Sequence, residues 1–315
     1  MTFNAVKVEK LANYSLNLLQ RSIILPSTIT VKSGEEFRGA LGDAITIKIG
    51  ARTKAKRTLI RPATENDRNI EFSDMSEQKT HVYLKHRIYN AQALEDEKAK
   101  LDVEDVFSQI VAPQVRSVAI DFENLIAEEI SGAPYKFVVD VDPDKTYHAF
   151  VEANRLLGQA FIPDDGRTLL VGANFEAALR LSPQFIAASS AGDTIASSLL
   201  ARASLGTING YNVVKSYALP ANEAYIIHRS AFSAAWLAPV VPDGASWGKS
   251  IGAEGGLSLT WLKDYDFSKG RDRSLVHVYA GTNTTIDEPD ENADNEVVAE
   301  GGFLRGAKLV LPDPS

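Results

Sequence analysis

Two spacings of hydrophobic residues divide the first part of the chain into strands and a long connection. Residues 41–49 alternate three isoleucines with Thr46 and Lys48, which is the period of two that a half-buried strand requires. A similar alternation runs over residues 82–88. The residues between them, 50–80, carry few large hydrophobic side chains and many charges. Because a long segment without its own core is uncommon inside a compact domain, we expect a long hairpin that projects from the body.

Other segments follow the helical spacing of three to four residues. Between residues 113 and 131 six apolar side chains fall on one helix face, namely Val115, Val118, Phe122, Leu125, Ile126 and Ile130. Pro113 suits the first turn of this long helix and Gly132 suits its end. Further helices are expected over residues 6–19, 145–159, 174–180 and 194–203.

The remaining segments predict a mixed α+β fold. Short strands are expected at residues 168–171, 211–215, 225–227, 257–261, 275–279 and 307–312. The length of 315 residues suggests about two domains. The acidic tract at residues 286–296 is expected to be a solvated loop, because dense like charge does not pack.

Composition removes several classes of function. With 33 Lys and Arg against 41 Asp and Glu the net charge is −8, which repels a polyphosphate and argues against a dedicated nucleic-acid reader. The absence of cysteine excludes disulfides, thiolate zinc sites and a cysteine nucleophile. The first residues do not read as a signal peptide, and no apolar run approaches the roughly 18 residues of a membrane span. We therefore expect a soluble protein that is made inside the cell.

Motifs that carry chemistry are incomplete in this chain. Residues 244–250, GASWGKS, have three residues between their glycines where a phosphate-binding loop needs four. Residues 140–144 place aspartates at alternate positions, but Lys145 and Val151 stand where a calcium loop needs Gly and Glu. We interpret this run as a solvated turn. No metal site is expected.

The histidines also lack a catalytic or metal-binding pattern. The five histidines are His81, His86, His148, His228 and His277. No two of them have the spacing of four residues that puts two imidazoles on one helix face, so each is expected on the surface or in a polar network. Neither GxSxG nor GxGxxG occurs. We expect no cofactor and no enzymatic activity. An unrecognised α/β hydrolase or transferase is the alternative, with the charged hairpin as an active-site lid.

The order of these parts resembles the coat proteins of tailed bacteriophages, which have the Hong Kong 97-type fold. The resemblance spans nearly the whole chain. It is carried by RSIILPSTIT with LGDAITIKI, by FSQIVAPQVRSVAIDFENLI, by RTLLVGANFEAALR, LGTINGYNVVKSYALP and IIHRSAFSAAW, and by GLSLTWLKDYDFSKGRDRSLVHVYAGT.

The resemblance implies a division of the chain into the family's parts. These are an N-terminal arm (1–34), an extended loop (35–90), a peripheral domain (91–160 and 262–315) with its spine helix at about 113–131, and an axial domain (161–261). A short helix would begin near Ser230. Residues 239–253 are too few for the large inserted domain of one branch, so none is expected.

The resemblance also implies a function in assembly. The chain would self-assemble as pentamers and hexamers into an icosahedral shell that encloses the double-stranded DNA of a tailed phage, without sequence-specific contacts. Assembly would take place in the host cytoplasm, with no membrane, and with scaffolding, portal and decoration proteins as further partners. Alternatives are an encapsulin-like compartment that holds enzyme cargo, and a tail or adaptor protein that forms rings or tubes.

Charges on the extended loop suggest where neighbouring copies meet. Five basic residues, Arg52, Lys54, Lys56, Arg57 and Arg61, would lie across an acidic surface of a neighbour. The candidate partners are Glu95, Asp96, Glu97, Asp102, Glu104 and Asp105. In the alternative, the basic residues are simply solvated.

Overall fold

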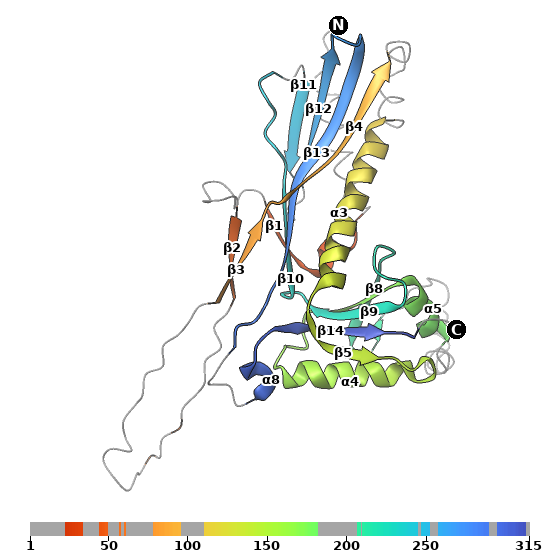
Figure 1. Ribbon diagram of the computed structural model, residues 1–315, viewed down its shortest axis with the longest axis vertical. Coiled ribbons are helices and arrows are strands. Elements are labelled where there is room, and N and C mark those ends of the chain that lie inside the picture. Colours follow the sequence, from red (N-terminus) through yellow and green to blue (C-terminus); the bar gives the residue numbers. More distant parts are fainter. Residues whose placement is uncertain are drawn as a thin grey trace.

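Two β-layers and one long helix make up an elongated body in the computed structural model (Figure 1). The structure describes residues 23–33, 44–49, 57, 60, 78–95, 110–181, 207–208, 210–244, 247–252, 258–289 and 295–312. No helix within these ranges is long and apolar enough to cross a membrane.

The first layer, called the long sheet below, is organised around one strand of 14 residues, β13 (Arg271–Thr284). The first half of β13 pairs with β12 and its last residues pair with β10, while β4 runs along its other edge. The remaining strands of the long sheet are β1 (Thr30–Ser33), β4 (His86–Glu95), β10 (Phe232–Leu237), β11 (Trp247–Gly252) and β12 (Ser258–Asp266).

Helix α3 (Ala112–Gly132) lies along one face of the long sheet (Figure 1). Its predicted apolar face is buried, and the rings of Phe122 and Trp236 meet edge to face with their centroids 4.1 Å apart. Gln114 is fully buried on this face and donates to the Asn90 and Ser274 carbonyl oxygens. The predicted helix of residues 113–131 is therefore confirmed, with Pro113 in its first turn.

The second layer is a six-stranded sheet in the order β5-β14-β9-β6-β8-β7. Helix α4 (Thr146–Gln159) packs on β14 and β5, and helix α5 (Ala173–Leu181) lies beside β9. Phe150 of α4 and Phe175 of α5 fill the core between them. The strands are β5 (Tyr135–Asp140), β6 (Arg167–Val171), β7 (Thr207–Ile208), β8 (Tyr211–Lys215), β9 (Glu223–His228) and β14 (Phe303–Val310).

Strand pairing groups the chain differently from the expected division at residues 160 and 161. Segments β5, α4 and β14, which we expected in the peripheral part, belong to the same layer as β6, β8 and β9. Strands β10 and β11, which we expected in the axial part, belong to the long sheet. The alternation of apolar residues along the chain predicts each strand, but it does not predict which strands pair with one another.

A two-stranded hairpin begins where the extended loop was expected. Strands β2 (Ala44–Ile49) and β3 (Gln78–Tyr83) pair antiparallel, with Ile45 opposite Val82 and both side chains buried. The predicted strand of residues 82–88 is interrupted after Tyr83, where β3 ends and the chain turns into β4. This turn packs tightly on β13, because a Cβ atom at Gly281 would lie 1.9 Å from the Tyr83 carbonyl oxygen.

The short helix expected near Ser230 is wrong. Ser230 lies in a turn, and strand β10 follows at Phe232. β10 pairs with both β1 and β13, and Phe232 to Trp236 are buried. The burial gained between two strands outweighs the local helix preference of this alanine-containing segment. The helices expected over 6–19 and 194–203 lie outside the described residues.

The acidic tract is only in part a solvated loop. Asp287 is buried and accepts hydrogen bonds from both Nε and Nη2 of Arg305, and Nη2 lies 2.7 Å from Asp287 Oδ1. Asn295 begins helix α8 (Glu296–Ala299), where its side chain accepts a hydrogen bond from the Val297 amide. Residues 290–294 lie outside the described ranges.

Candidate assembly surfaces

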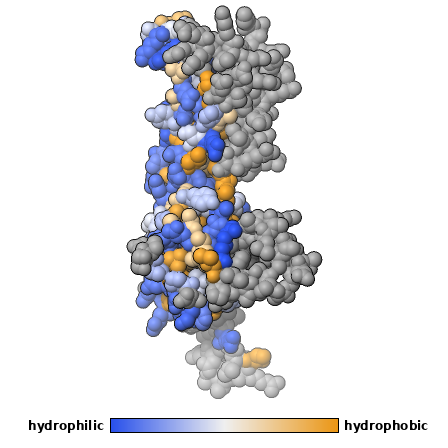
Figure 2. Space-filling model, turned by 90° about the vertical axis from the view of Figure 1, so that its right-hand side faces the viewer, coloured by the Kyte–Doolittle hydropathy of each residue, from blue (hydrophilic) through white to orange (hydrophobic). Residues whose placement is uncertain are grey.

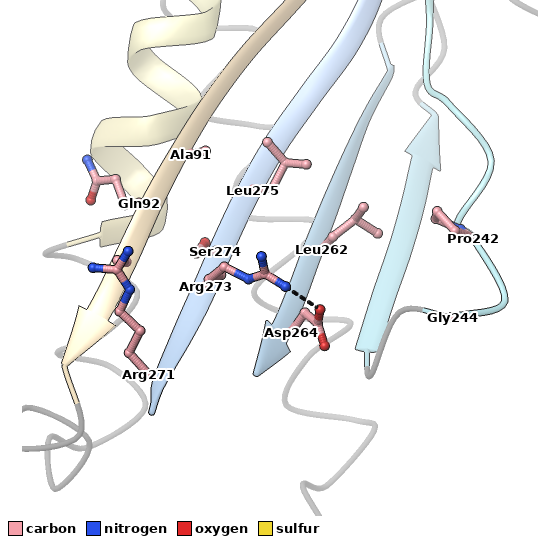
Figure 3. Close-up of a pocket in the computed structure, with 11 residues that line it drawn as sticks. Ala91, Gln92, Pro242, Gly244, Leu262, Asp264, Arg271, Arg273, Ser274 and Leu275 are labelled. Atoms are coloured by element: carbon pink, nitrogen blue, oxygen red, sulfur yellow. Dashed lines mark hydrogen bonds and ion pairs between the residues drawn. The ribbon is translucent and has the colours of Figure 1, made fainter. Parts of the chain in front are cut away.

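A groove of about 580 Å³ lies on the face of the long sheet opposite α3 (Figure 3). Its floor is a row of apolar side chains from three adjacent strands, since Leu275 of β13 stands opposite Ala91 of β4 and Leu262 of β12. Pro242 and Gly244 form one wall. The groove is therefore a shallow apolar trough across the strands.

The space in the groove depends on a glycine. Gly248 of β11 stands opposite Leu262, and a Cβ atom there would approach the Leu262 side chain to 2.5 Å and the Val241 side chain to 2.7 Å. Any other residue at this position would push Leu262 or the wall segment out of place.

Charged side chains surround the apolar floor. Arg273 donates to Asp264 at 2.9 Å, as Figure 3 shows, and Arg271 also lines the groove. These groups give the rim the mixed polarity of a protein contact. The described residues hold no cluster of three or more His, Cys, Asp or Glu side chains that could bind a metal.

A second groove, of about 490 Å³, runs between β4 and the outward side of α3. Tyr89 and Ile120 line it and are 65% and 48% exposed. On the side that Figure 2 shows, the described surface is mainly hydrophilic with small hydrophobic areas. The exposed apolar surface is thus spread over several small sites.

A buried carboxylate ties three segments together. Glu123 of α3 accepts hydrogen bonds from the Ile24 amide at 2.9 Å, from the Leu25 amide at 3.1 Å and from the Ser216 hydroxyl at 3.1 Å. Burial raises the pKa of the Glu123 carboxyl, and the hydrogen bonds from Ile24, Leu25 and Ser216 oppose this rise. Sequence patterns gave no signal for this contact, because Glu123 lies 99 residues from Ile24.

The histidines differ in environment. His81, His86 and His148 are exposed, and His228 exchanges a hydrogen bond with Ser230, in agreement with their predicted surface or polar-network positions. His277 does not agree, because it is buried within the long sheet and its Nδ1 atom has no hydrogen-bond partner. Burial, together with the nearby Arg87 charge, lowers the pKa of His277 to about 4.

Two of the predicted contact residues fall within the described ranges. Arg57 is exposed. Glu95 is the last residue of β4, and its backbone stands opposite that of Arg271 at the end of the groove. The contact between the basic loop and an acidic surface therefore stays a prediction. The candidates outside the described residues are Arg52, Lys54, Lys56, Arg61, Asp96, Glu97, Asp102, Glu104 and Asp105.

The sequence and the fold of the chain both resemble those of known proteins. Residues 89–291, more than half of the chain, match a family model described as "Phage capsid protein". The chain belongs to the phage capsid protein family. This makes it a structural protein of the virion capsid, and the match runs through both layers of the fold. No match was found among curated proteins.

Solved phage structures share the fold of this capsid protein. A structure titled "Mycobacterium phage Che8" has a TM-score of 0.59 at 14% identity and covers 91% of this chain and 90% of that chain. The capsid of cyanophage P-SCSP1u has a TM-score of 0.59 at 11% identity, covering 93% and 89%. The capsid of Ralstonia phage GP4 has a TM-score of 0.58 at 13% identity, covering 91% and 88%. The expected Hong Kong 97-type fold is confirmed.

Proposed function

We propose that this capsid protein is the major shell subunit of a tailed phage, and that its copies form pentamers and hexamers that close into an icosahedral shell around double-stranded DNA. The family match over residues 89–291 carries this proposal. The long sheet, the spine-like helix α3 and the second layer fit the parts of such a subunit. Contacts between unlike surfaces of identical copies can close into rings and then into a shell.

In the proposed shell, many weak contacts act together. The basic residues of the extended loop lie across a neighbour, near the end of β4 where the Glu95 backbone borders the groove. One exposed ion pair contributes only about 0.2 to 1 kcal/mol. Several simultaneous contacts multiply weak affinities by about 10² to 10⁴. Such contacts also let a misplaced copy leave before the shell closes.

We assign the family's domains from strand pairing. The peripheral domain consists of the long sheet with α3, and the axial domain consists of the second layer with α4 and α5. Scaffolding, portal and decoration proteins are the further partners, and assembly takes place in the host cytoplasm. The net charge of −8 gives the shell no strong affinity for DNA, so the genome is held by enclosure.

The test is negative-stain electron microscopy of the purified protein, after sizing chromatography at low and moderate salt. Closed shells of uniform diameter are the expected result, with or without a co-expressed scaffolding protein. Nucleic acid inside shells isolated from infected cells would support genome enclosure, and enzyme cargo in its place would favour a compartment. A protein that stays monomeric in every buffer, also with scaffold, would refute the proposal.

A further inference from the structure

An aromatic residue ends helix α4 where glycine is the usual choice. The Ile162 amide donates to the Leu157 carbonyl at 3.1 Å, and the Phe161 amide donates to the Gly158 carbonyl at 3.0 Å. This pair of bonds closes a helix with a left-handed residue, which is most often glycine. Here that residue is Phe161, with φ of 55°, the one non-glycine residue of positive φ among the described residues.

The same side chain is turned to solvent. Phe161 is 70% exposed, while the next residue, Ile162, is buried against the layer. A left-handed conformation is unfavourable for a bulky L-residue, and an exposed aromatic ring gains nothing from burial. The backbone conformation therefore destabilises the isolated subunit, and the exposed ring does not offset this cost. Unfavourable backbone conformations of this kind concentrate at functional positions.

Phe161 stands at one end of the second layer. It precedes the start of β6, and Asn295 at the start of α8 donates to the Gln159 carbonyl beside it. At the other end, Leu181 is the last residue of α5 and Tyr217 follows the end of β8, and each is 75% exposed. Figure 1 shows α8 and α5 at opposite ends of this layer. The layer therefore has an exposed apolar site at each end.

We infer that Phe161 is a contact between copies, and that its ring packs against Leu181 and Tyr217 of the next copy. The inference rests on the proposed function, because the occupant is a second copy of this chain. Contacts that build a ring join unlike surfaces of neighbouring copies, which the two opposite ends of the layer provide. Lys215 holds its ammonium 5.6 Å from the centroid of the Tyr217 ring, at the edge of this receiving site.

Substitution of Phe161 separates assembly from folding. Phe161→Gly removes the ring and supplies the residue that the left-handed position favours. The variant is expected to raise the urea midpoint of the unassembled subunit. It is also expected to raise at least tenfold the protein concentration at which half of the chains are assembled, measured by light scattering and sizing chromatography. Phe161→Tyr keeps the ring and the backbone conformation, and is expected to assemble like the wild type.

Each outcome has one meaning. If the wild-type chain never assembles, the proposed function fails and this inference fails with it. If the wild type assembles and Phe161→Gly assembles equally well, only the contact at Phe161 is refuted. Tyr217→Ser tests the receiving end in the same assay, and unchanged assembly of that variant would refute the assignment to this end of the next copy.

Discussion

The carboxylate of Glu123 offers a sharp test of what holds the chain near residue 24 against helix α3. In Glu123→Leu the side chain keeps its approximate size but no longer accepts from the Ile24 and Leu25 amides. A buried donor without a partner costs about 1 to 3 kcal/mol. Leu25 is fully buried, whereas Ile24 is 46% exposed, so water can replace part of the hydrogen bond that the Ile24 amide loses. We expect a loss of about 2 to 4 kcal/mol.

Glu123→Gln distinguishes the acceptor from the charge. Its single oxygen can accept from both amides while its amide group donates to Ser216, so we expect a loss below about 1 kcal/mol. Because burial raises the pKa of the Glu123 carboxyl, the folded chain holds this proton to higher pH than the unfolded chain. The carboxyl's contribution to stability is thus complete below pH 4.5 and declines as the pH rises through the raised pKa, and this dependence is absent in the Gln variant.

Urea unfolding and hydrogen exchange measure the two variants. Glu123→Leu should lower the urea midpoint and speed exchange of the Ile24 and Leu25 amides at least tenfold, which corresponds to about 1.4 kcal/mol. Asp121→Asn, on the exposed side of the same helix, is the control and should change stability by less than about 0.5 kcal/mol. Unchanged exchange in the Leu variant, or equal damage from Gln and Leu, would refute the reasoning.

Three further substitutions test the interior. His277→Phe should remove a pH dependence, because the folded pKa of about 4 lies below the ordinary 6.5 and the wild type therefore loses about 2 kcal/mol of stability by pH 5. If the urea midpoint changes equally between pH 7.5 and pH 5 in the wild type and the variant, this explanation is wrong. Asp287→Asn leaves the Arg305 charge buried and should cost about 3 kcal/mol in urea unfolding, whereas Glu152→Gln, in an exposed pair with Arg155, should leave the urea midpoint nearly unchanged. Equal losses would argue against burial as the cause. Gly281→Ala should lower the unfolding free energy by at least about 2 kcal/mol because of the clash with Tyr83, and Gly132→Ala, which meets nothing within 4 Å, should be neutral; an unchanged unfolding free energy in Gly281→Ala would show that the turn can move.

Elements with their own periodicity could be predicted from the sequence. The apolar spacing of residues 113–131 is a local property, and the helix observed extends it by one residue at each end. Strand β8 has the predicted bounds for the same reason. The helix predicted near Ser230 was wrong because residues distant in sequence determine the structure there. Ser233 of β10 pairs with Thr30, about 200 positions away.

Parts of the site depend on such distant partners. Asp287 was predicted as solvated from the charge of its neighbours in sequence, and only the position of Arg305 on β14 explains its burial. His277 was expected on the surface or in a polar network, and its burial could not be predicted, because an alternating strand pattern does not tell whether the second face of the sheet is covered. The groove could not be predicted either, since its floor combines β4, β12 and β13 from separate parts of the chain.

Strand β13 has a consequence for how this subunit tolerates change. It joins the rest of the long sheet through backbone hydrogen bonds with β4, β10 and β12 along 14 residues, so the span of the subunit is determined mainly by main-chain geometry. Side chains on the open face can then vary without altering that span. Dimensions and surface specificity are separable in such a subunit, and a lineage can replace what its copies recognise in one another while keeping the size of the building block.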